Sequence, residues 1–369
     1  MIVVGTRPEI IKMASVVDAC KKLKLAHFIV HTEQHYDNNM SSIFLYQLEM
    51  KPDYSLNVGS STHAVQTARA MIALEKVMIK EEPDIVLSVG DTNTVLAAGL
   101  AAVKQHIPVG HIEAGLRSND LRMPEEHNRR LVDHVSTYLF APTEMAYKNL
   151  EEEHVWGSIH VTGNTVIDAC LKYMPIAEKE SNIMERIDLD NFALATVHRE
   201  ENVENKKVIL DIMKVFTRVE IPVVFVAHPR TLLRLKKWVQ LSKRIDESGN
   251  VKVLPAVGYF DFLVLMKNCS FIMADSGGIQ EEATAMNIRK FVFVLRESTE
   301  RPESVDAGFA KVVGTNANQI LNEVKTYLAY GNTDISNPSP YGDGRAGERI
   351  IQVIKDEKDQ PRHVNQRVI

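Results

Sequence analysis

Short apolar runs alternate with longer amphipathic segments along nearly the whole chain. The strand candidates are Ile2–Val4, Phe28–His31, Ile85–Val89, Pro108–Ile112, Tyr138–Ala141, Ile159–Val161, Phe192–Val197, Val223–Ala227, Val251–Leu254, Phe271–Ala274, Phe291–Val294 and Lys311–Val313. Their lack of polar alternation is typical of sheets that are covered on both faces. The segment Val65–Glu81, with apolar positions at Ala68, Ile72, Val77 and Ile79, is typical of the amphipathic helices between them.

These repeated strand–helix units favour parallel sheets with right-handed crossovers. The series is interrupted between Asp168 and Asp190, where the charged stretch Leu171–Arg186 contains Pro175 and predicts a helix and linker. Since each half has its own series, we predict an α/β fold with two Rossmann-like, doubly wound domains.

The end of the chain departs from this pattern. Residues 332–347 are rich in Asn, Ser, Pro and Gly, which predicts a loop. A last helix is expected at Ala346–Lys355, and the polar residues 356–369 are expected to be loosely ordered. The predicted divisions are 1–168 for an N-terminal domain, 169–343 for a C-terminal domain, and 344–369 for the last helix and polar tail.

Composition excludes several classes of protein. Of the 369 residues, 45% are hydrophobic and 25% are charged, as in ordinary globular domains, and the net charge of −5 does not favour nucleic acid or anionic lipid. Cys20, Cys170 and Cys269 are widely spaced, so each is expected to pack as a small hydrophobe. With neither a leader segment nor a membrane-length apolar run, we expect a cytoplasmic protein without nucleic-acid or membrane partners.

The stretch Asp275–Glu282 is the strongest candidate for a binding site. It reads Asp-Ser-Gly-Gly-Ile-Gln-Glu-Glu and follows the predicted strand Phe271–Ala274, and a helical pattern continues through Ala283–Met286. Glycines let backbone N–H groups approach a ligand, and a helix N-terminus favours an anion, so Ser276, Gly277 and Gly278 predict a phosphate site. An ordinary strand-to-helix turn is the alternative.

Polar side chains also follow the strands of the N-terminal half, where ligands of parallel sheets bind. Gly5–Lys12 comes after the first strand and places Arg7 near a helix start, where a cation suits a bound anion unless it pairs with Glu9. Asp91 follows the third strand, where it could also cap a helix. Glu113 follows the fourth, with Arg117 as a candidate partner.

The segment Pro124–Arg130 adds Glu125 and Arg129, whose spacing of four residues also allows a simple helix ion pair. In the C-terminal half, His198 follows the first strand, His228 follows the second, and the charged run Arg296–Glu303 follows another. The N-terminal half thus supplies carboxylates and the C-terminal half a phosphate site with a histidine. This division suits an enzyme acting on a sugar nucleotide.

Other nucleotide and metal chemistry lacks a motif. No GxxxxGK[ST] loop for ATP occurs, no GxGxxG follows the first strand, and the His and Cys spacing offers no metal cluster. We therefore expect neither a metal nor a cofactor.

The motifs together resemble the non-hydrolysing UDP-N-acetylglucosamine 2-epimerases. The matching segments are GTRPEIIK (5–12), EQH (33–35), GDT (90–92), HIEAGLR (111–117), PEEHNR (124–129), VTGNTVIDA (161–169), HREEN (198–202), DSGGIQEEA (275–283) and ESTERPE (297–303). They occur in the family's order and cover nearly the whole chain. The resemblance implies a glycosyltransferase B-type architecture, in which two Rossmann-like domains face each other across a cleft and the last helix returns to the first domain.

The same resemblance implies a homodimer that interconverts UDP-GlcNAc and UDP-ManNAc by eliminating UDP to give 2-acetamidoglucal and adding it back, feeding cell-surface polysaccharide or glycan synthesis. Positions matching catalytic residues are Asp91, Glu113, Glu125 and His198. Positions matching UDP or sugar ligands are Arg7, Lys12, Arg129, His198, Ser276, Gly277, Gly278, Gln280, Glu282 and Arg301. Positions matching an allosteric UDP-GlcNAc site are Gln34, His35, Arg69 and His228.

Three alternatives share the predicted fold and UDP site. A glycosyltransferase would need an acceptor, a hydrolysing epimerase would release free ManNAc and UDP, and a UDP-sugar sensor could lack the carboxylates. The presence of Asp91, Glu113 and Glu125 argues against the sensor.

Overall fold

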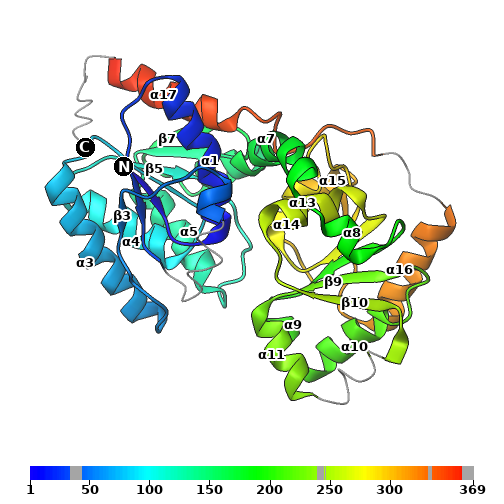
Figure 1. Cartoon of the computed structure of the whole chain (residues 1–369). Coiled ribbons are helices and arrows are strands. Elements are labelled where there is room, and N and C mark those ends of the chain that lie inside the picture. Colours follow the sequence, from blue (N-terminus) through cyan, green and yellow to red (C-terminus); the bar gives the residue numbers. More distant parts are fainter. Residues whose placement is uncertain (34–43, 239–244, 246, 331–334, 360–369) are drawn as a thin grey trace. The chain divides into compact units, whose positions relative to one another are not determined.

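The computed structural model describes residues 1–33, 44–238, 245, 247–330 and 335–359. The chain divides into two compact units (Figure 1). Unit one comprises Met1–Ala169 and Gly342–Ile369, and unit two comprises Cys170–Tyr341. The divisions predicted from the sequence lie after residues 168 and 343.

Unit one is built on a seven-stranded parallel sheet in the order β3-β2-β1-β4-β5-β6-β7. Its strands are β1 Ile2–Val4, β2 Ile29–His31, β3 Tyr54–Ser55, β4 Val86–Val89, β5 Val109–Ile112, β6 Tyr138–Ala141 and β7 Ser158–Val161. Its helices are α1 Arg7–Lys22, α3 His63–Glu81, α4 Asn93–Lys104, α5 Pro124–Val135, α6 Glu144–Glu152, the start of α7 Thr165–Glu180, and α17 Ala346–Asp359. The strand order reverses between β1 and β4, so the loops after these two strands border the position where ligands of such sheets bind.

Unit two repeats this plan on a six-stranded parallel sheet in the order β10-β9-β8-β11-β12-β13. Its strands are β8 Ala193–Thr196, β9 Val223–Ala227, β10 Val251–Pro255, β11 Phe271–Ala274, β12 Val292–Val294 and β13 Ala310–Val312. Its helices, besides most of α7, are α8 Ile183–Ile187, α9 Glu200–Val203, α10 Lys206–Phe216, α11 Pro229–Lys237, α13 Tyr259–Asn268, α14 Gly277–Glu282, α15 Pro302–Asp306 and α16 Ala317–Tyr330. Here the order reverses between β8 and β11. The two parallel-sheet units confirm the predicted fold class.

The structure departs from the prediction most clearly at three elements. The two-residue strand β3 was missed because Tyr54–Ser55 is too short to give a hydrophobic pattern. The helix predicted within Leu171–Arg186 begins earlier, at Thr165, and α7 continues through Pro175 to Glu180. Helix α14 ends at Glu282 and does not continue through Ala283–Met286, where the backbone forms turns.

Helix α3 buries a different face from the one suggested by its apolar residues. Among the predicted apolar positions, Val77 is buried, whereas Ile72 and Ile79 are 57% and 60% exposed. The residues packed on the sheet are Ala70, Leu74, Val77 and Met78, which follow the i, i+4, i+7, i+8 spacing of a helix face. Val65, Ile72 and Ile79 therefore form an exposed apolar line at seven-residue spacing.

Helix α17 packs against α1, although the two are separated by almost the whole chain (Figure 1). The carboxylate of Asp168 accepts hydrogen bonds from the N–H groups of Ala346 at 3.1 Å and Gly347 at 2.8 Å. A side chain at Gly347 would meet the carbonyl oxygen of Ser15 at 2.7 Å, so glycine allows the close approach of the two helices. Helix α17 is thus an integral part of unit one.

The three cysteines are buried and unbridged, which confirms the prediction that each packs as a small hydrophobe. Within the described part of the chain, no helix has the combination of length and apolar character that crossing a membrane requires.

Candidate active site

Glu113 follows β5 directly and has an unusual backbone conformation. Its φ of +68° lies in the left-handed region, which costs a non-glycine residue about 1 kcal/mol or more and often marks functional sites. The carboxylate is buried, and its Oε1 accepts hydrogen bonds from Lys12 Nζ at 2.6 Å and Asn164 Nδ2 at 2.8 Å. These two donors compensate the buried negative charge and fix its direction.

The predicted partner of Glu113 was wrong. Arg117 instead places its guanidinium 2.7 Å from the carboxylate of Asp133 and 2.6 Å from that of Glu153. Because the backbone turns at Glu113 and again at Gly115, which has a φ of +81°, a spacing of four residues does not bring the side chains of Glu113 and Arg117 together. Glu113 therefore pairs with Lys12 of α1 and not with Arg117.

Asp91 follows β4 and forms an ion pair with Arg129 at 2.5 Å, and its carbonyl accepts a hydrogen bond from Asn128 Nδ2 at 2.9 Å. The residue that caps α4 is Thr92, so the suggestion that Asp91 caps this helix was wrong. Arg129 also bonds Glu126 at 3.0 Å, and this replaces the suggested pair with Glu125.

The loops that carry Asp91 and Glu113 contact each other. A Cβ atom on Gly90 would lie 3.5 Å from Glu113 Oε2, and the N–H of Gly90 donates to the carbonyl of Ile112 at 3.1 Å. Glu125 is partly buried in the first turn of α5, and its carboxylate makes no hydrogen bond or ion pair with another described residue. Unit one thus brings the loops after β4 and β5 into contact and leaves the Glu125 carboxylate available.

The turn after β1 is held by a buried acid, Glu9. Its carboxylate accepts hydrogen bonds from the Gly5 N–H at 2.6 Å and from the Thr6 hydroxyl at 2.9 Å. Arg7 is partly exposed and its guanidinium carbon lies 5.8 Å from the centre of the Phe44 ring. Glu9 therefore fixes the backbone from which Arg7 projects.

Burial raises the pKa of Glu9 from its ordinary value of 4.5 to about 7, although the hydrogen bonds from Gly5 and Thr6 oppose this. The folded state then binds more protons than the unfolded state between these values, so the free energy of unfolding should fall as pH rises through this window. Relative to wild type, Glu9→Gln should gain about 3 kcal/mol between pH 4 and pH 8. Urea unfolding of both proteins at several pH values measures the difference, and parallel pH curves would contradict the assignment.

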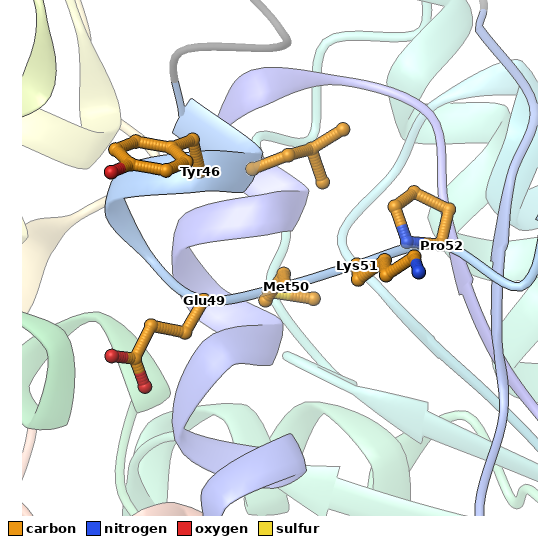
Figure 2. A pocket seen from close by; sticks show the side chains of 6 residues that line it. Tyr46, Glu49, Met50, Lys51 and Pro52 are labelled. Carbon is orange, nitrogen blue, oxygen red and sulfur yellow. The ribbon is translucent and has the colours of Figure 1, made fainter.

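A surface hollow of about 490 Å³ lies in unit one, lined by Leu45, Tyr46, Glu49, Met50, Lys51 and Pro52. Figure 2 shows that these side chains come from one short helix and the segment after it. None of them is a predicted site residue.

In unit two, Asp275 organises the loops after β8 and β11. This fully buried carboxylate accepts hydrogen bonds from the N–H of His198 at 3.1 Å, the N–H of Arg199 at 3.0 Å and the Asn202 side-chain amide at 3.0 Å. Asp275 thus places His198 beside the Ser276 loop, at the reversal point of the second sheet. The partly buried His198 ring has a lowered pKa because desolvation and the charges of Arg199 and Arg230 outweigh the attraction of Asp275.

The Ser276–Gly278 turn packs against a cluster of ion pairs centred on Glu300. A Cβ atom on Gly277 would lie 3.0 Å from Glu300 Oε1 and 3.6 Å from the guanidinium carbon of Arg301, so only glycine fits easily. Glu300 also bonds Arg199 at 2.7 Å and pairs with Arg296. Burial opposes ionisation of Glu300, but these arginines and Arg301 lower its pKa to about 2.

Two of the predicted ligands, Gln280 and Arg301, bond to residues in and around the turn. Gln280 is fully buried, donates to the Ser276 carbonyl at 3.1 Å and accepts from the Thr299 hydroxyl at 2.7 Å. Arg301 is buried and pairs with Glu281. Both side chains therefore hold the shape of the turn.

The predicted allosteric positions belong to both units. Gln34 and His35 lie outside the described residues. Arg69 is exposed on α3 of unit one, and His228 lies in unit two, with its ring centre 5.9 Å from that of His198. The positioning roles of Asn164, Asn202 and Asp275 were not predicted. Asn164 and Asp275 lie within three residues of the carboxyl end of a strand, and Asn202 lies in α9.

Two parallel-sheet units, each with polar side chains gathered where its strand order reverses, define a two-domain α/β enzyme of glycosyltransferase B-like architecture. Residues 18–355 match the family model described as UDP-N-acetylglucosamine 2-epimerase. The chain belongs to this family and is an epimerase, which is a kind of isomerase.

Individual relatives cover nearly the whole chain. The UDP-N-acetylglucosamine 2-epimerase of Methanocaldococcus jannaschii is 44% identical over 363 residues, which are 96% of this chain and 98% of that protein. A crystal structure of the M. jannaschii UDP-GlcNAc 2-epimerase in complex with UDP-GlcNAc and UDP has a TM-score of 0.89 and 43% identity, covering 96% of this chain and 99% of that one. The UDP-2,3-diacetamido-2,3-dideoxy-D-glucuronate 2-epimerase of Pseudomonas aeruginosa is 37% identical over 360 residues, 95% of this chain and 98% of that protein.

Proposed function

We propose that this protein interconverts UDP-GlcNAc and UDP-ManNAc by eliminating UDP to give 2-acetamidoglucal and then adding UDP back. The observation that carries the proposal is Glu113, a buried carboxylate in a left-handed backbone conformation that is held by Lys12 and Asn164. It lies next to the Gly90 loop that carries Asp91. A fixed acid pair of this kind suits proton removal at one carbon and its return from the other face.

The chemistry explains why both a phosphate site and acids are needed. The hydrogen at C2 of the sugar is barely acidic, because no carbonyl group is adjacent to C2. If the C1–O bond to UDP loosens first, positive charge grows at C1 and acidifies C2–H. In this proposal Arg7, His198 and the Ser276 turn stabilise the departing diphosphate. One of Asp91, Glu113 and Glu125 removes the proton, and no redox cofactor is required.

Proton NMR of the wild-type enzyme with UDP-GlcNAc in heavy water tests the reaction directly. We expect UDP-ManNAc with deuterium at C2, formed without an acceptor. Transfer of the sugar only when an acceptor is added would favour a glycosyltransferase. Release of free ManNAc with UDP would favour a hydrolysing epimerase. An epimer that keeps its original C2 hydrogen would contradict the elimination route.

The P. aeruginosa relative named for a diacetamido glucuronate sugar provides a second substrate to compare. In our proposal UDP-GlcNAc gives the higher kcat/KM in the same assay. Preference for the uronate would keep the reaction class and change the sugar. We further propose a cytoplasmic enzyme whose product feeds cell-surface polysaccharide or glycan synthesis, and an activating second UDP-GlcNAc at Gln34, His35, Arg69 and His228.

We also propose that the protein is a homodimer, and α3 offers the surface on which to test it. Val65, Ile72 and Ile79 are 40%, 57% and 60% exposed along one line of this helix. Such a line is self-complementary when a second copy packs across a two-fold axis. Ile72→Glu should therefore increase the monomer fraction in light scattering, whereas Lys148→Glu, at an exposed position on α6, should not. Equal dimer fractions in both variants would place the interface elsewhere.

A further inference from the structure

We propose that His111, paired with Asp133, is a positioning residue that couples the two loops carrying Asp91 and Glu113. His111 is fully buried on β5, two residues before Glu113. Its Nδ1 lies 2.6 Å from Asp133 Oδ1, and its Nε2 lies 2.8 Å from the carbonyl oxygen of Gly90. The inference rests on the proposed function, because it concerns the geometry of the same two acids.

The partners of the ring determine its protonation. A carbonyl oxygen can only accept, so Nε2 must carry a proton. Asp133 is also the acceptor for the Gly115 N–H at 3.1 Å and for Arg117 at 2.7 Å, which favours an ionised carboxylate and a proton on Nδ1 as well. Burial alone would lower the pKa of His111, but the attraction of Asp133 outweighs it and raises the pKa.

The imidazolium therefore holds both loops through one buried ion pair. On one side it donates to Gly90, the residue before Asp91. On the other side Asp133 accepts from Gly115, two residues after Glu113. The N–H of Gly90 also donates to the carbonyl of Ile112, so β5 holds both backbone polar groups of Gly90.

The effect on catalysis follows from distance. A displacement of about 1 Å between catalytic groups can lower the rate about 10²-fold, because the reacting atoms no longer meet in line. A loss of the Gly90 contact should therefore lower kcat more than it changes KM. If His111 only filled space in the core, its substitution would lower stability, and kcat would not depend on whether the new side chain can still bond Gly90.

Two substitutions of similar size separate these roles. The amide nitrogen of His111→Gln occupies a position like Nε2 and can still donate to Gly90. The amide of His111→Asn is placed like Nδ1, so it can reach Asp133 but not Gly90. With UDP-GlcNAc as substrate, we expect the Gln variant to keep a kcat at least about tenfold above that of the Asn variant. Equal kcat values in two variants with similar thermal unfolding would overturn the proposal.

Asp133→Asn provides a second test if either variant fails to fold. The Asn oxygen would take the place of Asp133 Oδ2, which accepts from Gly115 and Arg117, and the Asn amide would donate to Nδ1 of a neutral ring. Such a ring keeps its Nε2 proton on the Gly90 carbonyl, so kcat should stay closer to that of His111→Gln than to that of His111→Asn. A kcat as low as that of His111→Asn would contradict the coupling.

A third measurement does not depend on activity. In nitrogen-15 NMR of the histidine-labelled full chain, assigned with His111→Gln, both ring nitrogens of His111 should be protonated at pH 7. A neutral ring would overturn the proposal even in an active enzyme. A wild-type enzyme that binds UDP but leaves UDP-GlcNAc unchanged would contradict the proposed function, while a doubly protonated ring would still support the geometry.

Discussion

Glu113→Gln is expected to lower kcat at least about 10²-fold, which places it among the largest losses of activity of the substitutions considered. The amide cannot remove a proton from carbon, but its oxygen can still accept from Lys12 and Asn164. The fold should therefore persist, and the loss should appear in kcat rather than in thermal stability. Steady-state kinetics with UDP-GlcNAc, together with a thermal melt, measures both.

Lys12→Met provides the matched control, because it removes the partner of Glu113 and leaves the acid. If Lys12 acts through Glu113, the double variant should be little slower than Glu113→Gln alone. Asp91→Asn and Glu125→Gln should also lower kcat by about 10²-fold or more if each acts as acid or base. Near-normal turnover in all three amide variants would end this mechanism.

Asp275→Asn is expected to have the largest effect on stability. The carboxylate accepts from two backbone N–H groups and from Asn202 while fully buried. The amide offers one oxygen and introduces a donor, so at least one buried donor loses its partner. We expect a loss of about 3 kcal/mol in the free energy of unfolding. UDP binding should weaken by roughly tenfold, because His198 and the Ser276 turn lose their common support.

His198→Ala is the comparison for this prediction. The ring is partly exposed, so its removal should leave the unfolding transition nearly unchanged and weaken UDP binding. Urea unfolding and calorimetric titration with UDP separate the two variants. Unchanged UDP affinity and turnover in His198→Ala would remove this residue from the site, and an unchanged unfolding curve in Asp275→Asn would show that its hydrogen bonds add little.

The sheets were predictable because buried parallel strands give uninterrupted apolar runs, and Tyr138–Ala141, Val223–Ala227 and Phe271–Ala274 have the predicted bounds. The partners of the charged residues were not predictable from spacing. Arg117 is four residues from Glu113, yet it pairs with Asp133 on α5, because left-handed backbone separates it from the acid. In a loop, sequence distance carries little information on contacts.

Helix α5 shows a related limit. Glu125 and Glu126 are both within one helical turn of Arg129, and helical spacing alone favours neither strongly. The partner of Arg129 depends on Asp91, which lies 38 positions away. The guanidinium bonds the Asp91 carboxylate and in that position also pairs with Glu126. The positioning roles of Asn164 and Asp275 likewise depend on contacts with residues remote in sequence.

Helix α17 has a consequence for how the protein folds as it is synthesised. The surface of α1 that receives this helix leaves the ribosome early, but α17 follows only after residues 170–341 have been made. At typical rates of translation this interval lasts roughly ten to thirty seconds. Unit two can thus complete its fold first. During this interval the surface of α1 that later contacts α17 stays exposed and can bind chaperones.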